Sequence, residues 1–431
     1  MSARRVSFYL LLAGSVALYL LDPFIRISSK NLLPSDIFFV ASATFLMFSY
    51  RNFLRFETEL TRFPGMNAFA VFLLASMLGF LITALRRSVS PGFHLASAAQ
   101  LVFTFVLLGP LVLAHKNDLS DAKKLWLVHL WLIPFAGLLS LTDFVGLTNL
   151  GEQVGERHYN VILDSNFVNG FWLFGLASPF LLQKIFPFRL TTLFYAALWL
   201  FACCGTMLAG TRTAVVIVAL SVVFVAWLNL DSILHDKRVL AGFLLFLAVT
   251  IGGGLRMFDA FPVISGRFQQ TRDFFEAGQD DYSASLRKDQ LQIVFHDLES
   301  KPLTWLGSGL KQYRLIHPED AIEAIHNMYL QELYEAGLGG LIAFTLIFVA
   351  SMLKSGRCYR AAAAARDSEA RKYWACCLFA VFAYLLMGFV YPTGYYRHFW
   401  LFLFLATPST REYLKLRESA FQIPSGNAVG G

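Results

Sequence analysis

Charged residues are scarce in this sequence. Asp, Glu, Lys and Arg make up 15% of its 431 residues, against about 25% in an average soluble domain. Hydrophobic residues make up 56%, and the mean hydropathy is +0.55. These values exclude an ordinary soluble domain and indicate a protein that crosses a membrane several times. The formal net charge of +7 does not indicate a nucleic-acid partner, because the basic residues lie in short segments between apolar ones.

The sequence also lacks the motifs of metal and nucleotide sites. No Asp-x-Asp pair lies in a segment expected outside the membrane, since Asp280 and Asp281 are adjacent. No P-loop is present, and no G-x-G-x-x-G follows a predicted strand, so ATP and NAD are not indicated. We therefore expect no metal and no cofactor. The cysteines are not spaced like zinc ligands or a disulfide framework; they are Cys203, Cys204, Cys358, Cys376 and Cys377.

Long apolar segments fill most of the chain. They predict an all-α polytopic membrane protein with about twelve transmembrane helices of roughly 17–25 residues. The one long polar interval predicts a periplasmic loop that carries short helices. The expected spans are 6–25, 32–50, 66–85, 93–114, 124–143, 165–183, 190–209, 213–230, 239–256, 334–353, 372–391 and 394–408.

These spans divide the chain into four parts. Residues 1–256 hold nine spans, residues 257–325 form a lid loop, residues 326–410 hold three spans, and residues 411–431 form a tail. Short loops on one side carry about three times as many Lys and Arg residues as those on the other, and such an excess marks the cytoplasmic side. We therefore expect both termini in the cytoplasm and the lid loop outside.

The stretch HNMYLQELYEAGLGGL, residues 326–341, closes the polar interval and opens a span. Read as one helix of 3.6 residues per turn, it has two faces. One face, expected to pack inward, holds His326, Leu330, Leu333, Gly337 and Gly340; the other holds Met328, Glu332, Glu335 and Gly339. A histidine here can carry a proton, since its reference pKa is about 6.5. It can equally be an interfacial residue that a backbone carbonyl satisfies.

Three arginines are candidates for binding an anion on the same membrane side. Arg212, in Gly210-Thr211-Arg212-Thr213, starts a span, and helix N-termini bind anions; the alternative is an arginine that snorkels to the interface. Arg267 either joins this cluster or pairs with a nearby loop carboxylate, Asp273 or Glu276.

The third arginine, Arg287, lies in an expected helix that Ser283 or Ser285 caps and that runs to about Glu299. It shares one face of that helix with three apolar residues: Leu291, Val294 and Leu298. It either snorkels at the edge of the lid or points into a cavity that faces the membrane.

Four segments together resemble the O-antigen ligase-like membrane proteins. HNMYLQELYEAGLGGL resembles the His-Asn block at the end of the family's periplasmic loop, and AGTRTA resembles its small-residue turn with an arginine. SLRKDQLQIVFHDLESKPLTWLGSGLKQY is similar to the loop element, and YNVILDSNF is similar to a further region, with Ser165 where proline is usual.

The resemblance implies an enzyme of the bacterial inner membrane, a glycosyltransferase without a metal. Such an enzyme moves a glycan from undecaprenyl diphosphate to an acceptor hydroxyl on the periplasmic side, with inversion. An O-antigen ligase uses lipid A-core as acceptor, and a polymerase uses a carrier-linked repeat unit. Carried over, Arg212 and Arg287 hold the diphosphate, and His326 acts as the general base or orients the acceptor.

A compact lid and a chain of about ligase size favour the ligase over the polymerase. A lipid-linked glycan transporter is the alternative from another class, but it predicts charges near span midpoints and inverted repeats. The expected partners are the carrier-linked glycan, its acceptor and membrane lipids.

Overall fold

The structure is a computed structural model that describes most of the N-terminal and C-terminal thirds of the chain. The described residues are 2–20, 33–48, 50–86, 89–116, 121, 124–126, 151–154, 157–160, 282–318, 325–389 and 397–421, with single residues and short runs between 219 and 276. The chain divides into two compact units. Unit 1 comprises Met1–Val128 and Arg287–Gly431, and unit 2 comprises His129–Leu286.

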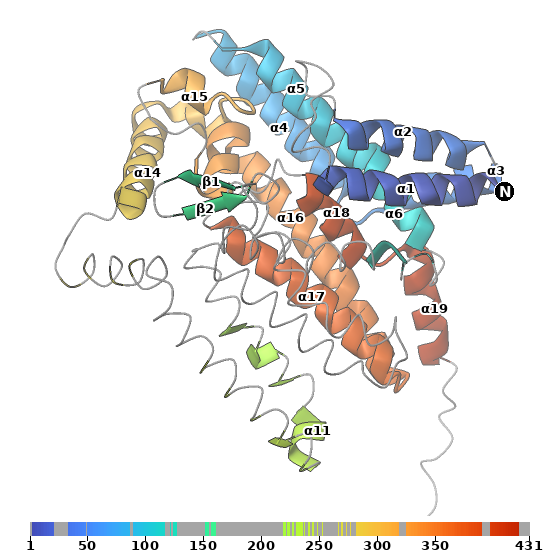
Figure 1. The fold of residues 1–431 in the computed structure, drawn as a ribbon. Coiled ribbons are helices and arrows are strands. Elements are labelled where there is room, and N and C mark those ends of the chain that lie inside the picture. The colour runs from blue at the N-terminus through green and yellow to red at the C-terminus, as the bar shows by residue number, and fades with distance from the viewer. Residues whose placement is uncertain are drawn as a thin grey trace, which may run out of the picture. The chain divides into compact units, whose positions relative to one another are not determined.

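Unit 1 is built from helices (Figure 1). Its first part contains α1 (Ala3–Leu20), α2 (Pro34–Met47), α3 (Tyr50–Arg62), α4 (Met66–Ala84), α5 (Pro91–Val102), a π-helix (η1, Phe103–Leu108) and α6 (Gly109–Lys116). Its second part contains α14 (Tyr282–Ser300, which begins just before the unit boundary), a 3-10 helix (η2, Pro302–Leu306), α15 (Tyr313–Ile316), α16 (Met328–Ala364), α17 (Ser368–Gly388), α18 (Arg397–Ala406) and α19 (Thr410–Phe421).

The described part of unit 2 includes one departure from the expected all-α fold. Strands β1 (Gly151–Val154) and β2 (Arg157–Asn160) form an antiparallel hairpin in which Gly151 pairs with Asn160 and Val154 pairs with Arg157. A short helix, α11 (Leu230–His235), lies later in this unit. Helices otherwise dominate the described residues, in agreement with the predicted class.

Four described helices are long and apolar enough to cross a membrane: Met66–Ala84, Pro91–Lys116, Met328–Ala364 and Ala370–Gly388. They match the expected spans 66–85, 93–114, 334–353 and 372–391. A fifth candidate is the pair α2 and α3, which is bent by 119°. The expected count of about twelve is not confirmed. The described helices at the expected spans 6–25 and 394–408, α1 and α18, are not among these candidates. The spans at 165–183 and 190–209, and most of those at 124–143, 213–230 and 239–256, lie outside the described residues.

Helix α16 is central to unit 1. It packs along α4 on one side and α17 on another, while α1 pairs with α2 (Figure 1). Aromatic rings fill the contacts with α18: Phe344 and Phe348 of α16 each pack against Trp400, with ring centroids 5.7 Å apart in both cases. Much of the aromatic content is therefore buried between helices, where large rings contribute strongly to packing.

A buried lysine, Lys116, is the last residue of α6 and contacts the segment between α18 and α19. Lys116 is fully buried, and its Nζ donates hydrogen bonds to the carbonyl oxygens of Leu405 and Thr407. Its Nζ also lies 3.8 Å from the Glu412 carboxylate. These carbonyls belong to the C-terminal end of α18, which has no intrahelical donors for them. Lys116 thus satisfies the helix end and fixes the start of α19.

Candidate functional site

His326 lies at a bend shortly before α16. Asn327 is the N-cap of the helix: its Oδ1 accepts a hydrogen bond of 2.9 Å from the Leu330 N–H. Its Nδ2 donates to the Phe389 carbonyl at 3.2 Å, which ties the cap to the end of α17. The expectation that His326 belongs to the helix is therefore wrong. The reason is that an Asn side chain at this position satisfies the free N–H groups and starts the helix at Met328.

The His326 main chain is held by α14. The His326 N–H donates a hydrogen bond of 3.0 Å to Oε1 of Gln290, and Gln290 is 2% exposed. The His326 side chain is half-buried. Gln290 follows Arg287 by three residues, so the two lie on neighbouring turns of one helix face. Arg287 is itself partly buried. The structure therefore brings the helix that carries Arg287 against the segment that carries His326.

The buried face of α14 differs in part from the predicted one. Val294 and Leu298 are buried, as expected, but Leu291 is 45% exposed and is not on that face. Gln290 and Asp297 are buried with them instead. The face is rotated toward these polar residues because each has a hydrogen-bond partner on a neighbouring segment, which offsets the cost of burying it.

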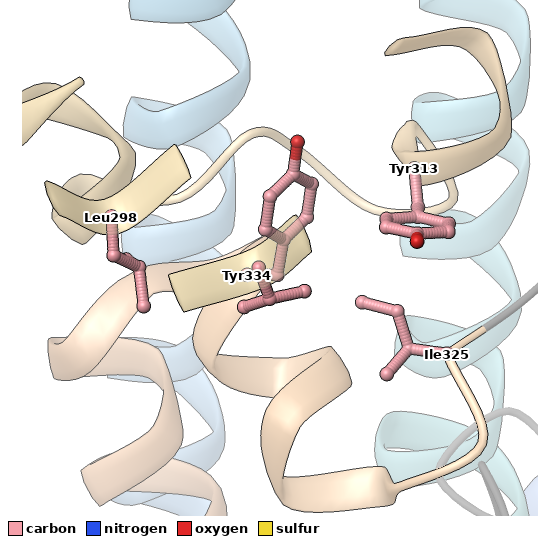
Figure 2. Packing of buried hydrophobic residues seen from close by; sticks show 5 residues of the cluster. Leu298, Tyr313, Ile325 and Tyr334 are labelled. Atoms are coloured by element: carbon pink, nitrogen blue, oxygen red, sulfur yellow. The ribbon is translucent and has the colours of Figure 1, made fainter. Parts of the chain in front are cut away.

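An apolar cluster fastens α14 to α15 and α16. Figure 2 shows four residues of this cluster packed together: Leu298 of α14, Tyr313 of α15, Ile325 of the segment before α16, and Tyr334 of α16. Val294 completes the buried set. The Tyr313 and Tyr334 rings meet edge to face, with centroids 5.5 Å apart. The whole cluster therefore joins α14, α15 and α16.

A polar network lies beside this cluster. Oδ2 of Asp297 accepts hydrogen bonds from the Tyr334 hydroxyl at 2.9 Å and from His317 Nε2 at 3.0 Å, and Lys301 pairs with the other carboxylate oxygen. Burial alone raises the pKa of the Asp297 carboxyl, but hydrogen bonds outweigh it and hold the pKa below its usual range; the donors are His317, Lys301 and Tyr334. Asp297 is therefore a carboxylate at neutral pH. Removal of its partners would leave a buried negative charge without compensation.

Helix α16 is broken at Gly337, where φ is 74° and ψ is −179°. In an uninterrupted helix the carbonyls of Tyr334 and Glu335 accept from the amides four residues later. Here they accept from the Ser308 and Gly309 amides, at 2.9 and 2.8 Å. The loop after η2 thus supplies donors to the broken helix. The predicted single helix face from residue 326 to residue 341 does not exist, because the helix changes direction within it.

Glycines make this crossing of loop and helices possible. A Cβ on Gly337 would lie 2.5 Å from the Leu306 carbonyl carbon, and one on Gly307 would lie 2.6 Å from the Glu335 carbonyl oxygen. On the other side of the loop, a Cβ on Gly79 of α4 would lie 2.5 Å from the Leu306 carbonyl oxygen. The loop therefore passes between α4 and α16 at backbone distance, which only glycine permits.

Two further contacts fix this loop to α5. Nδ1 of His94 accepts a hydrogen bond of 3.0 Å from the Leu310 N–H. Gln312 pairs with the main chain of Ser90 in both directions: its Oε1 accepts from the amide at 3.0 Å and its Nε2 donates to the carbonyl at 3.2 Å. The described end of the predicted lid is thus anchored on the α4–α5 hairpin.

The first turns of α16 bury polar side chains, including two that were expected on the face opposite His326, Glu332 and Glu335. Gln331, Glu332 and Glu335 are each 2% exposed, and Gln331 Nε2 donates to Glu335 Oε1 at 3.2 Å. Within the described part of the chain, Oε2 of Glu332 has no hydrogen-bond partner. Ionisable side chains inside membrane helices are rare and commonly functional. This part of α16 therefore belongs to the candidate site.

Two of the predicted site residues, Arg212 and Arg267, lie outside the described residues. Among the residues that the structure describes, no three His, Cys, Asp or Glu side chains are grouped so that they could hold a metal ion. The arrangement near α14 and α16 provides a cation at Arg287, an imidazole at His326 and carboxyl groups at Glu332 and Glu335. Such a set can bind an anion and accept a proton.

No curated protein sequence matches the chain significantly. The model of one family, described as O-antigen ligase, matches residues 196–345. The match includes α14, the loop that crosses α16, His326 and the break at Gly337. It supports a function of the O-antigen ligase or polymerase type and, with the apolar helices, a membrane protein. Residues 196–345 of this chain are thus similar to the O-antigen ligase family, in agreement with the resemblance of the motifs in this stretch.

Proposed function

We propose that the protein is an O-antigen ligase, a metal-independent inverting glycosyltransferase of the bacterial inner membrane. Its donor is a glycan on undecaprenyl diphosphate, and its acceptor is a hydroxyl of lipid A-core. One observation carries the proposal. The matched span of the family contains all four predicted site residues, and within it the helix of Arg287 is bonded to the main chain of His326. The four are Arg212, Arg267, Arg287 and His326.

The arginines are assigned to the diphosphate. A guanidinium presents planar N–H donors that match phosphate oxygens in pairs and stays charged at every working pH. Negative charge grows on the diphosphate as it leaves the sugar, so fixed cations stabilise the transition state more than the ground state. Arg287 supplies one such cation from α14, and Arg212 and Arg267 are proposed to supply the others.

His326 is assigned to the acceptor. The acceptor oxygen attacks the anomeric carbon from the face opposite the diphosphate, so that the new C–O bond inverts the configuration. The bond from the anomeric carbon to the diphosphate oxygen breaks, and undecaprenyl diphosphate leaves with that electron pair. The neutral imidazole of His326 accepts the proton of the hydroxyl. An imidazole suits this role because its reference pKa lies near working pH.

An experiment with two acceptors tests the proposed reaction. Purified protein receives undecaprenyl-diphosphate glycan labelled in the sugar, together with lipid A-core and an unlabelled carrier-linked repeat unit. The proposal predicts label on lipid A-core. Growth of the carrier-linked chain instead would identify a polymerase, which the family match also supports. Label that remains on the original carrier, with folded protein, would contradict transfer and favour the transport alternative.

The proposed topology can be tested at exposed residues. Gln292 lies on the exposed face of α14, so Gln292→Cys is expected to react with a membrane-impermeant maleimide added to the periplasmic side of intact cells. The matched control is Glu418→Cys in α19, also exposed, which should react only after the membrane is permeabilised. Wild-type protein gives the background from the five native cysteines, of which Cys358, Cys376 and Cys377 are buried. Labelling of Glu418→Cys in intact cells would reverse the orientation.

A further inference from the structure

We propose that Gln290 is a positioning residue that sets the place of His326 relative to Arg287. This inference rests on the proposed function, in which Arg287 holds the leaving diphosphate and His326 takes the acceptor proton. The bond that Gln290 accepts comes from the main-chain N–H of His326. Gln290 thus acts through the main chain of His326.

One side-chain hydrogen bond joins α14 to the segment that carries His326. Oε1 of Gln290 accepts a hydrogen bond of 3.0 Å from the His326 N–H. His326 precedes the N-cap of α16, so its amide is not part of the hydrogen-bond ladder of that helix. Gln290 is buried and His326 is half-buried, so the bond is partly shielded from water. Removal of the Gln290 acceptor oxygen costs this bond and is expected to let the segment at His326 shift.

The same helix, α14, carries both Gln290 and Arg287. The two residues are three positions apart and therefore neighbours on the helix surface. The position of the His326 amide is thus set from the helix turn next to the arginine. An error of about 1 Å between reacting groups can lower a rate about 10²-fold. A single side chain that couples the two groups is therefore expected to affect turnover.

Contacts other than the Gln290 bond hold α14 and the start of α16 in place. Helix α14 is docked independently of Gln290, farther along its length, by Asp297 and by Leu298 in the apolar cluster. The start of α16 is fixed independently by the Asn327 cap and its bond to Phe389. Loss of the Gln290 acceptor should consequently leave both helices in place and change only the segment at His326.

The test compares three substitutions on α14. Gln290→Met keeps the length of the side chain but removes the acceptor oxygen. Gln290→Glu keeps an acceptor at the same reach, next to the Arg287 cation on the neighbouring turn. The matched control is Gln292→Met, at an exposed position of the same helix. We expect Gln290→Met to lower kcat about 10-fold to 10²-fold, with the KM for the lipid-linked donor unchanged. Gln290→Glu should recover most of the rate, and Gln292→Met should match the wild type.

A second readout observes the bond directly. Hydrogen exchange of the peptide that contains the His326 amide should be faster in Gln290→Met, while exchange in the rest of α16 and the melting temperature stay at wild-type values. Faster exchange throughout α14 and α16 would instead mean that Gln290 only supports the fold and would overturn the proposal. Wild-type kcat in Gln290→Met would overturn it as well.

Combination with His326→Ala separates this proposal from the proposed function. If Gln290 acts through His326, Gln290→Met should cause no further loss of rate in the His326→Ala background. An equal further loss in that background would overturn the positioning role while the function stands. A wild-type rate in His326→Ala alone would remove His326 from the chemistry, and the positioning role would fall with it. Absence of transfer by the wild-type protein would overturn the proposed function itself.

Discussion

The His326→Ala variant is expected to transfer glycan about 10²–10⁴-fold more slowly than the wild-type protein, which is the range for loss of a general base. The fold should survive the substitution. The hydrogen bond to Gln290 is made by the main-chain N–H of residue 326, which alanine retains. The cap of α16 belongs to Asn327 and is also retained. The loss should therefore appear in the rate, with thermal unfolding and the KM for the donor close to wild type.

The chain offers a matched control for this variant. His296 lies on α14, close in sequence to the candidate site, and is exposed. His296→Ala removes the same side chain and is expected to keep the wild-type rate. Equal rates for His326→Ala and the wild-type protein would remove the histidine from the chemistry. Equal loss in both histidine variants would point to a general defect of the preparation instead.

Substitution of Gly337 by alanine is expected to have the largest effect on stability, a loss of about 3 kcal/mol. The residue has φ 74° and ψ −179°, a region essentially restricted to glycine. A Cβ would also lie 2.6 Å or less from backbone atoms of Trp305 and Leu306. If α16 straightened to avoid this strain, its own amides would take the carbonyls of Tyr334 and Glu335. The amides of the crossing loop would then lose their acceptors.

Gly339→Ala is the control for this prediction. It lies two residues further along the same helix, and a Cβ there meets nothing within 4 Å. Thermal unfolding in detergent should show a lowered melting temperature for Gly337→Ala and an unchanged or raised one for Gly339→Ala, since alanine favours a helix by about 1 kcal/mol over glycine. Indistinguishable melting of the two variants would contradict the role of the break.

Local sequence patterns predicted much of unit 1. Four expected spans coincide with helices that are long and apolar enough to cross a membrane, because long apolar runs are read directly from hydropathy. The helix expected from Ser283 or Ser285 to about Glu299 is observed as Tyr282–Ser300. Composition suffices for a membrane span, because a span requires only a long run of apolar side chains. Periodicity suffices for a helix that packs on one core, because its apolar side chains recur on one face.

The features that periodicity missed depend on distant partners. The break at Gly337 is satisfied by Ser308 and Gly309, about 30 residues earlier in the chain, and no helical wheel contains that contact. Leu291 was placed on the buried face because it is apolar. The structure buries Gln290 there because its acceptor meets the His326 amide. Asn327 could have been recognised as a cap, since Asn is a preferred N-cap residue directly before an apolar helix.

Transfer by the purified protein in the presence of EDTA tests the central claim most directly. Wild type, His326→Ala and Arg287→Ala would each receive undecaprenyl-diphosphate glycan and lipid A-core, and glycan on lipid A-core would be measured over time. We expect full activity of the wild-type protein without metal and a severe loss in both variants. Activity that EDTA abolishes and added metal restores would contradict a metal-independent mechanism. Wild-type rates in both variants would contradict the proposed roles of His326 and Arg287.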